Sequence, residues 1–258
     1  MEKMIDAHIH LDRYGAEEIS GMVENLLFLE AMVTVSFDLA SSEKNLQLAR
    51  KYDKVKPAFG FHPEQPLPGE KQFETLLNWM SDYKDEMIAV GEVGLPYYLR
   101  KEQGLSPYQS GQYLELLEQF IKLAKQWGKP VALHAVYDDA PIVCDLLEKY
   151  SLTKAHFHWF KGDSKTIDRM IGNGYFVSIT PDILYEPEIQ ELAGSYPLGQ
   201  MMIETDGPWP FEGPFKGKRT HPGMMAESVK QLAAIKKIPE TDVSRILLEN
   251  TKKLYRLS

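Results

Sequence analysis

The sequence predicts an α/β fold, specifically a (β/α)8 barrel of the TIM type with an extra helix at its C-terminus. Eight short apolar runs rich in β-branched residues recur along the 258 residues, and each is followed by a polar turn and an amphipathic stretch. Strand–helix units of roughly 30 residues imply parallel strands joined by right-handed crossovers. Eight such units favour a closed barrel, and an open doubly wound sheet is the alternative.

The predicted strands follow one another in chain order. Their sequences are KMIDAHIH (3–10), MVTVSF (32–37), VKPAFGF (55–61), MIAVGEV (87–93), PVALHA (130–135), KAHFHWF (154–160), YFVSIT (175–180) and QMMIET (200–205). Helical spacing is clearest over residues 109–127, and a further helix is expected at 241–256. Because no linker, low-complexity segment or glycine-rich nucleotide fingerprint divides the chain, we expect one domain spanning residues 1–258.

Composition and charge bound the function. The hydrophobic fraction of 43% and the charged fraction of 26% are ordinary for a globular protein, and no apolar run approaches the roughly 18 residues of a membrane span. A net charge of −8 argues against a general nucleic-acid coat protein. The N-terminus lacks the basic region followed by an apolar core that a signal peptide would have. We therefore expect a cytoplasmic protein without membrane association. The single cysteine, Cys144, lies in an apolar pattern typical of a buried side chain rather than a nucleophile.

Two histidines stand one residue apart near the start of the chain, in DAHIHLD. Apolar residues alternate with Asp6, His8 and His10, which is the two-residue period of a strand. In a strand, His8 and His10 point to the same face, where they can chelate a metal ion. A half-buried, hydrogen-bonded pair without a metal is the alternative.

Four further residues of metal-binding type lie at or just after the ends of other predicted strands. They are Glu92, His134, His158 and Asp206. A carboxylate inside an apolar strand is costly unless it is paired or coordinated, and strand ends converge on one face of a barrel. We therefore expect these residues to complete a metal site with His8 and His10. Six ligands suit two divalent ions bridged by a carboxylate.

Further motifs follow in order along the chain. They are GFHPE (60–64), GEVGLPYY (91–98), HWFKG (158–162), ETDGP (204–208), KGKRTHP (216–222) and LLENTKKLY (247–255). Together with DAHIHLD and His134, this series resembles the TatD-like metal-dependent hydrolases, the TatD DNase family of the amidohydrolase superfamily. Each motif alone is a weak signal, whereas the whole series in this order is highly specific.

The resemblance implies a (β/α)8 barrel with two divalent metal ions per chain, zinc, manganese or magnesium. One ion would be held by His8, His10, Glu92 and Asp206. The other would be held by Glu92, His134 and His158. The ligand types alone are compatible with zinc, manganese, cobalt or nickel, whereas magnesium usually prefers oxygen ligands.

The resemblance also implies catalytic roles and a reaction. Glu92 would bridge the ions, Asp206 would act as general base on the attacking water, and His62 would lie near the scissile phosphate. The expected activity is metal-dependent hydrolysis of phosphodiester bonds, deoxyribonuclease-like and from chain ends. The expected partner is DNA or a small phosphoester substrate, with no obligate protein partner.

This sequence departs from the family pattern on the substrate side. Pro96 stands where the family usually has aspartate, Trp159 replaces a cysteine, Lys161 replaces a small residue, and THP (220–222) replaces Asn-Glu-Pro. None of these changes removes an expected ligand. Two alternatives to a nuclease stay open: a small-molecule amide, lactone or ester hydrolase using the same two metals, and a metal-binding scaffold without turnover.

The loop after the last predicted strand carries the expected substrate contacts. Lys216, Lys218 and Arg219 form a basic cluster where barrel enzymes often bind phosphate, and Trp209 offers a ring for stacking on a base. A solvated loop that does not contact substrate is the alternative.

Three other residues are expected near the site but are not expected ligands. His156 shares a face with His158 but lies one layer deeper, so we interpret it as a core histidine or one that supports the ligands. Asp6 is either a partner of the ligands or a buried, satisfied carboxylate. His221, after the basic loop, is expected at the surface or at the rim of the substrate site.

Overall fold

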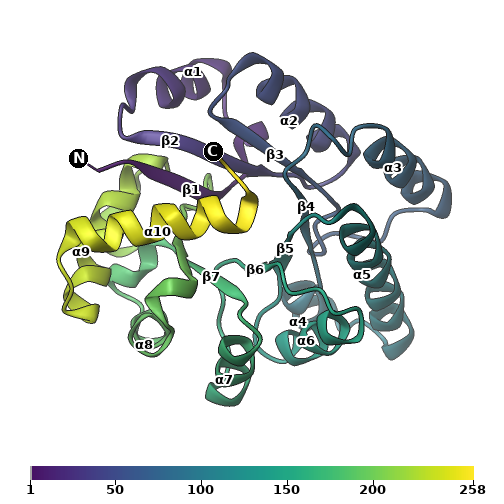
Figure 1. Ribbon diagram of the computed structural model, residues 1–258. Helices are drawn as coiled ribbons and strands as arrows, with labels where there is room; N and C mark the ends of the chain where they lie inside the picture. The colour runs from purple at the N-terminus through teal and green to yellow at the C-terminus, as the bar shows by residue number, and fades with distance from the viewer. Residues whose placement is uncertain (1) are drawn as a thin grey trace.

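Eight parallel strands form one sheet, in chain order, in the computed structural model, which describes residues 2–258 (Figure 1). The strands are β1 (Met4–Ile9), β2 (Leu29–Val35), β3 (Val55–Phe59), β4 (Ala89–Gly94), β5 (Val131–His134), β6 (Ala155–Phe157), β7 (Phe176–Ile179) and β8 (Met201–Ile203). Each strand pairs in parallel with the next along the chain. Helices surround the sheet, so the predicted (β/α)8 barrel is confirmed and the open doubly wound sheet is not formed.

The helices follow the strands in the expected alternation. The α-helices are α1 (Ala16–Asn25), α2 (Leu39–Lys51), α3 (Glu70–Asp82), α4 (Tyr97–Gln103), α5 (Pro107–Trp127), α6 (Asp139–Lys149), α7 (Ser164–Gly172), α8 (Pro187–Ser195), α9 (Met225–Lys236) and α10 (Glu240–Tyr255). Short 3-10 turns are η1 (Leu11–Arg13), η2 (Pro181–Leu184), η3 (Leu198–Gln200), η4 (Gly213–Phe215) and η5 (Pro222–Met224). The extra C-terminal helix is α10, which packs against β1 and β8. No helix in the described part of the chain is both long and apolar enough to cross a membrane.

β6 and β8 end earlier than their apolar runs predict, at Phe157 and Ile203. The backbone enters the left-handed region at Trp159, with φ 38°, and at Asp206, with φ 48°. Residues other than glycine rarely adopt this conformation, and they keep it only where the surrounding structure enforces it. These turns take the chain off the sheet at His158 and Asp206, two of the expected ligands.

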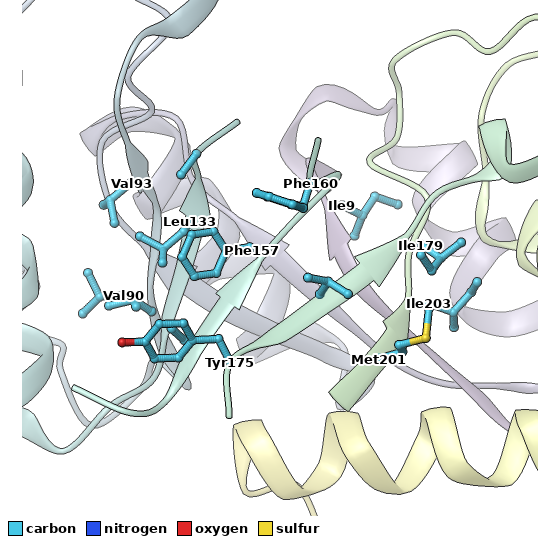
Figure 2. Packing of buried hydrophobic residues seen from close by; sticks show 14 of the residues in the cluster. Ile9, Val90, Val93, Leu133, Phe157, Phe160, Tyr175, Ile179, Met201 and Ile203 are labelled. Carbon is cyan, nitrogen blue, oxygen red and sulfur yellow. The ribbon is translucent and has the colours of Figure 1, made fainter. Parts of the chain in front are cut away.

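Buried hydrophobic side chains gather in two main regions. The larger combines strand residues with residues of the surrounding helices, and Figure 2 shows Val90 and Phe157 among its buried side chains. Burying a side chain of this size stabilises the fold by about 1.5–3 kcal/mol. The smaller region combines strand residues such as Ala132 with Leu254 and Tyr255 of α10. The C-terminal helix therefore contributes to the barrel core as well as to its outer layer.

The barrel is closed between β1 and the residues that follow β8. The backbone N–H of Asp206 donates to the carbonyl of His8 over 2.9 Å. The fully buried carboxylate of Asp6 accepts from the backbone N–H (3.0 Å) and the hydroxyl (2.5 Å) of Thr205. Burial raises the pKa of Asp6 to about 8. Asp6 is therefore a buried, satisfied carboxylate that joins the two edges of the sheet.

Replacing Thr205 by valine is expected to destabilise the fold. The change removes a hydroxyl donor and leaves one oxygen of Asp6 buried without that partner, at a cost of about 1–3 kcal/mol. Urea denaturation followed by circular dichroism measures the loss. Thr75→Val, which removes an exposed hydroxyl on α3, is the matched control and should change the free energy of unfolding by less than about 0.5 kcal/mol. Equal losses in the two variants would contradict the closing role of Asp6.

Candidate metal centre

The six expected ligands lie together at the C-terminal ends of the strands. They are His8 in β1, His10 just after β1, Glu92 in β4, His134 at the end of β5, His158 just after β6 and Asp206 after β8. All six are buried, with exposed fractions from 0% to 9%. They meet because each strand neighbours the next around the barrel, so positions far apart in the sequence become neighbours in space.

The first group of ligand atoms surrounds one oxygen of Glu92. Nε2 of His8 and Nε2 of His10 lie 3.2 and 3.3 Å from Glu92 Oε2. The same nitrogens lie 3.5 and 3.4 Å from Asp206 Oδ1. Donor atoms bound about 2.0–2.1 Å from a tetrahedral ion are about 3.3–3.4 Å apart. These four distances therefore match the spacing of ligands around a divalent ion, and the ligand atoms of His8, His10 and Glu92 all lie within 4.8 Å of one another.

These four atoms are also unsatisfied. None of His8 Nε2, His10 Nε2, Glu92 Oε2 and Asp206 Oδ1 has a hydrogen-bond partner within the described residues, although all are buried. Buried polar atoms in native proteins are nearly always paired, and leaving one unpaired costs about 1–3 kcal/mol. A cation bound between them would satisfy all four at once. The residues present therefore fit a divalent metal ion.

The second group of ligand atoms surrounds the other oxygen of Glu92. His158 Nε2 lies 2.6 Å, His134 Nδ1 3.1 Å and His62 Nε2 3.3 Å from Glu92 Oε1. His134 Nδ1 and His158 Nε2 are 3.3 Å apart. The two oxygens of Glu92 thus face two different sets of imidazole nitrogens. His62, which the sequence suggests only as a residue near the substrate, lies within this second set.

The close packing of these titratable groups shifts their pKa values. Burial opposes the charged form of Glu92, but the imidazoles of His158, His62 and His8 outweigh it and hold its pKa well below the usual range. Burial also opposes protonation of His10, yet the neighbouring carboxylates of Asp206 and Glu92 raise its pKa to about 9. Negative charge at Glu92 is therefore favoured, as a ligand for a cation requires.

Glu64 is a site residue that sequence reasoning missed. One of its carboxylate oxygens lies 3.1 Å from Nε2 of His134, the ring nitrogen on the opposite side from Glu92. The carboxylate also accepts the backbone N–H groups of Tyr98 (2.9 Å) and Leu99 (2.6 Å) in the first turn of α4. A proton on Nε2 directed at Glu64 would leave Nδ1 free to bind a metal, so Glu64 is a candidate for orienting the ring of His134. In the sequence, the only indication of this residue is its position at the end of the GFHPE motif.

A second carboxylate, Glu204, lies behind His158. It is fully buried, and it accepts the backbone N–H of Trp159 (2.9 Å) and the hydroxyl of Ser178 (2.5 Å). Its nearest oxygen is 3.8 Å from Nδ1 of His158. The hydroxyl of Ser178 is also 2.6 Å from Nε2 of His156, a residue whose two ring nitrogens both have protein partners. His156 is thus a hydrogen-bonded core histidine.

A cavity of about 550 Å³ opens directly onto the ligands, and we refer to it as the central cavity. Its lining residues are His10, His62, Glu64, Tyr98, Leu99, Glu102, His134, Val136, His158, Trp159, Asp206, Trp209 and Pro210. Four of the expected ligands contribute to the floor, and aromatic rings and aliphatic groups form much of the wall. Trp209 therefore lies where a substrate contact is expected.

The basic cluster of the last loop lies outside that lining. Lys216 pairs with Glu212 over 2.9 Å, and Arg219 pairs with Glu18 of α1 over 2.6 Å. The ammonium group of Lys218 lies 5.8 Å from the centroid of the Phe215 ring. None of these three basic residues lines the central cavity.

Comparison with known proteins identifies the family. The sequence pattern of the family described as TatD related DNase matches residues 5–256. An uncharacterized metal-dependent hydrolase of Haemophilus influenzae is 39% identical, over 98% of this chain and 100% of that protein. The deoxyribonuclease TATDN3 of Homo sapiens is 30% identical, over 98% of this chain and 94% of that protein.

Solved structures share the fold. The TatD homologue YJJV of Escherichia coli superposes with a TM-score of 0.86 at 24% identity, over 99% of this chain and 98% of that chain. A TatD family hydrolase of Entamoeba histolytica gives a TM-score of 0.82 at 18% identity, over 100% of this chain and 99% of that chain. From its match to the family pattern and to these relatives, the chain belongs to the TatD related DNase family of metal-dependent hydrolases.

Proposed function

We propose that this protein is a divalent-metal-dependent hydrolase with a dinuclear site at the C-terminal face of the barrel. The observation that carries the proposal is the buried carboxylate of Glu92, whose two oxygens face separate sets of imidazole nitrogens. The first ion would be held by His8, His10, Glu92 and Asp206. The second would be held by Glu92, His134 and His158, with His62 close enough to serve as a further donor.

The proposed reaction is hydrolysis of phosphodiester bonds in DNA, from chain ends. Support for DNA comes from the name of the human relative, deoxyribonuclease TATDN3. Support for chain ends comes from the size of the central cavity, since about 550 Å³ accommodates a group the size of a nucleotide but not a duplex. The rings of Trp209, Trp159 and Tyr98 line this cavity and offer faces on which a base can stack. Lys216, Lys218 and Arg219 remain predicted contacts for a longer strand outside the cavity.

The proposed reaction gives the metal centre, Asp206 and His62 separate roles. Divalent ions bound in the centre would polarise a phosphoryl oxygen and make a water more acidic. Asp206 belongs to the first ligand group and also lines the cavity, which supports its proposed role of accepting the proton of the attacking water. His62 lines the cavity beside Glu92, where its imidazole can bind the scissile phosphate.

A second candidate function has its own supporting observation. Within residues 2–258, no lysine or arginine lines the central cavity, whereas Glu64 and Glu102 do. Apolar walls with few positive charges suit a neutral substrate. The second candidate is therefore hydrolysis of a small-molecule amide, lactone or ester with the same two metals.

Metal loading is expected to reach two divalent ions per chain and to raise the midpoint of thermal unfolding, because an ion that binds only the folded state stabilises it. Glu92→Gln should lose both ions, since its carboxylate is shared. Glu102→Gln removes a carboxylate from the cavity wall without touching a ligand, so this control should keep both ions. Elemental analysis after dialysis against zinc or manganese, together with a thermal melt, measures both effects. A wild-type protein that holds a single ion would contradict the dinuclear proposal.

Asp206→Asn is expected to lower kcat by about 10²- to 10⁴-fold with a much smaller change in KM, since a general base acts mainly in the transition state. The substrate is bis(p-nitrophenyl) phosphate, and metal content is measured on the same samples. Near-wild-type turnover at unchanged metal content would rule out the general-base role.

The choice between the two functions needs a substrate panel. Metal-loaded protein is given a 5′-labelled single-stranded DNA oligonucleotide, p-nitrophenyl acetate and a simple lactone. The nuclease proposal expects shortening of the oligonucleotide from one end in a ladder of products. Hydrolysis of the acetate or lactone without any cleavage of DNA would favour the second candidate instead.

A further inference from the structure

Arg13 differs from most arginines of this chain in having no carboxylate partner. Five arginines form ion pairs: Arg50, Arg100, Arg169, Arg219 and Arg245. Arg13 and Arg256 form none within residues 2–258, and both are exposed. Arg13 ends η1, three residues after the ligand His10, whereas Arg256 follows α10 beside residues that begin the first two strands. Arg13 is thus an unneutralised cation close to the ligands.

Two aromatic rings hold the guanidinium of Arg13 in place. Its central carbon lies 4.4 Å from the ring centroid of Phe37 and 5.2 Å from that of Trp209. Within residues 2–258 the guanidinium nitrogens of Arg13 make no hydrogen bond or ion pair, so its N–H donors are free while the two rings attract its charge. The guanidinium of Arg219 also donates to the backbone carbonyl of Arg13 over 3.3 Å. The donors of Arg13 are therefore positioned before any ligand arrives, which reduces the entropy lost on binding.

The same two rings connect Arg13 to the candidate centre. The Phe37 ring stacks on the imidazole of His62, with centroids 4.4 Å apart and planes 13° apart. The Trp209 ring meets His10 edge-on at 6.1 Å. One aromatic ring thus separates the guanidinium from each of two site histidines. This places the cation at the rim of the central cavity, at the side where Trp209 forms the wall.

We propose that Arg13 binds a second phosphate of the substrate, the one next to the phosphate that is cleaved. The inference rests on the proposed phosphodiesterase function and names the substrate class more closely: a strand end with at least two phosphates. A planar guanidinium with free in-plane donors matches two phosphate oxygens. Because no lysine or arginine within residues 2–258 lines the cavity of this acidic protein, Arg13 supplies positive charge where the strand enters.

The test compares substrates that differ by one phosphate. The dinucleotide dTpdT has only the phosphate that is cleaved, the trinucleotide dTpdTpdT adds a phosphodiester, and pdTpdT adds a terminal phosphate. Wild-type protein is expected to show kcat/KM about 10- to 100-fold higher on at least one two-phosphate substrate than on dTpdT, the range for a charge-assisted hydrogen bond. A higher kcat/KM on dTpdTpdT would indicate that Arg13 binds a phosphodiester, and a higher kcat/KM on pdTpdT would indicate that it binds a terminal phosphate.

Three variants test whether Arg13 causes the preference for two-phosphate substrates. Arg13→Gln should reduce it to about one, and Arg13→Lys should leave an intermediate preference, because lysine keeps the charge but not the planar donors. Arg256→Gln removes an equally exposed and unpaired guanidinium elsewhere and should keep the full preference. Binding of labelled dTpdTpdT to metal-stripped protein gives a readout without catalysis. Its log–log salt slope should fall by about 0.7 in Arg13→Gln, which corresponds to one phosphate contact on a single strand.

Three outcomes would overturn the inference, and they differ in what they leave standing. If wild-type protein cleaves all three substrates but Arg13→Gln keeps its preference, the Arg13 site is wrong and the phosphodiesterase proposal stands. Equal losses on all three substrates in Arg13→Gln also exclude the site, because they indicate only a disturbed Trp209. If metal-loaded wild-type protein cleaves none of them, the proposed function fails and the inference fails with it.

Discussion

The buried carboxylate of Glu92 is the group around which the rest of the site is arranged. A negative charge inside an apolar strand is tolerated only when other groups compensate it. One oxygen faces His8 and His10, and the other faces nitrogens from the loops and strands on the opposite side. The backbone is also closely packed where β4 carries this residue: a Cβ at Gly60 would lie 2.8 Å from the backbone carbonyl oxygen of Glu92. Only glycine lets the chain after β3 pass so close to β4.

Carboxylates beyond the ligands hold both the backbone and the histidines. Asp6 accepts the N–H of Thr205, Glu64 accepts two N–H groups of α4, and Glu204 accepts the N–H of Trp159. Two of these acids also lie against ligand histidines, Glu64 beside His134 and Glu204 behind His158. The segments that leave the strands and the imidazole rings are therefore oriented by the same groups. Such outer partners fix a ligand's tautomer and direction.

The sequence predicts the barrel and the convergence of the ligands because both depend on regular periods. It does not predict Glu64 or Glu204, since hydrogen bonds to backbone N–H groups across the barrel leave no periodic trace. Nor does it predict that Arg219 pairs with Glu18, 201 residues away. Only the folded chain brings that loop against α1. The partners of a charged loop residue are therefore harder to predict from sequence than the face on which a strand residue points.

The position of α4 connects substrate recognition to the candidate metal centre. Tyr98 and Leu99 line the central cavity, and their backbone N–H groups are held by Glu64, the carboxylate that also orients His134. A substrate that displaces this wall therefore shifts the candidate ligand His134 through the side chain of Glu64. Pro96, which the family resemblance marks as a departure, comes immediately before α4. A change at this position alters the wall without replacing any candidate ligand, so specificity can diverge in this chain while the candidate metal centre keeps its residues.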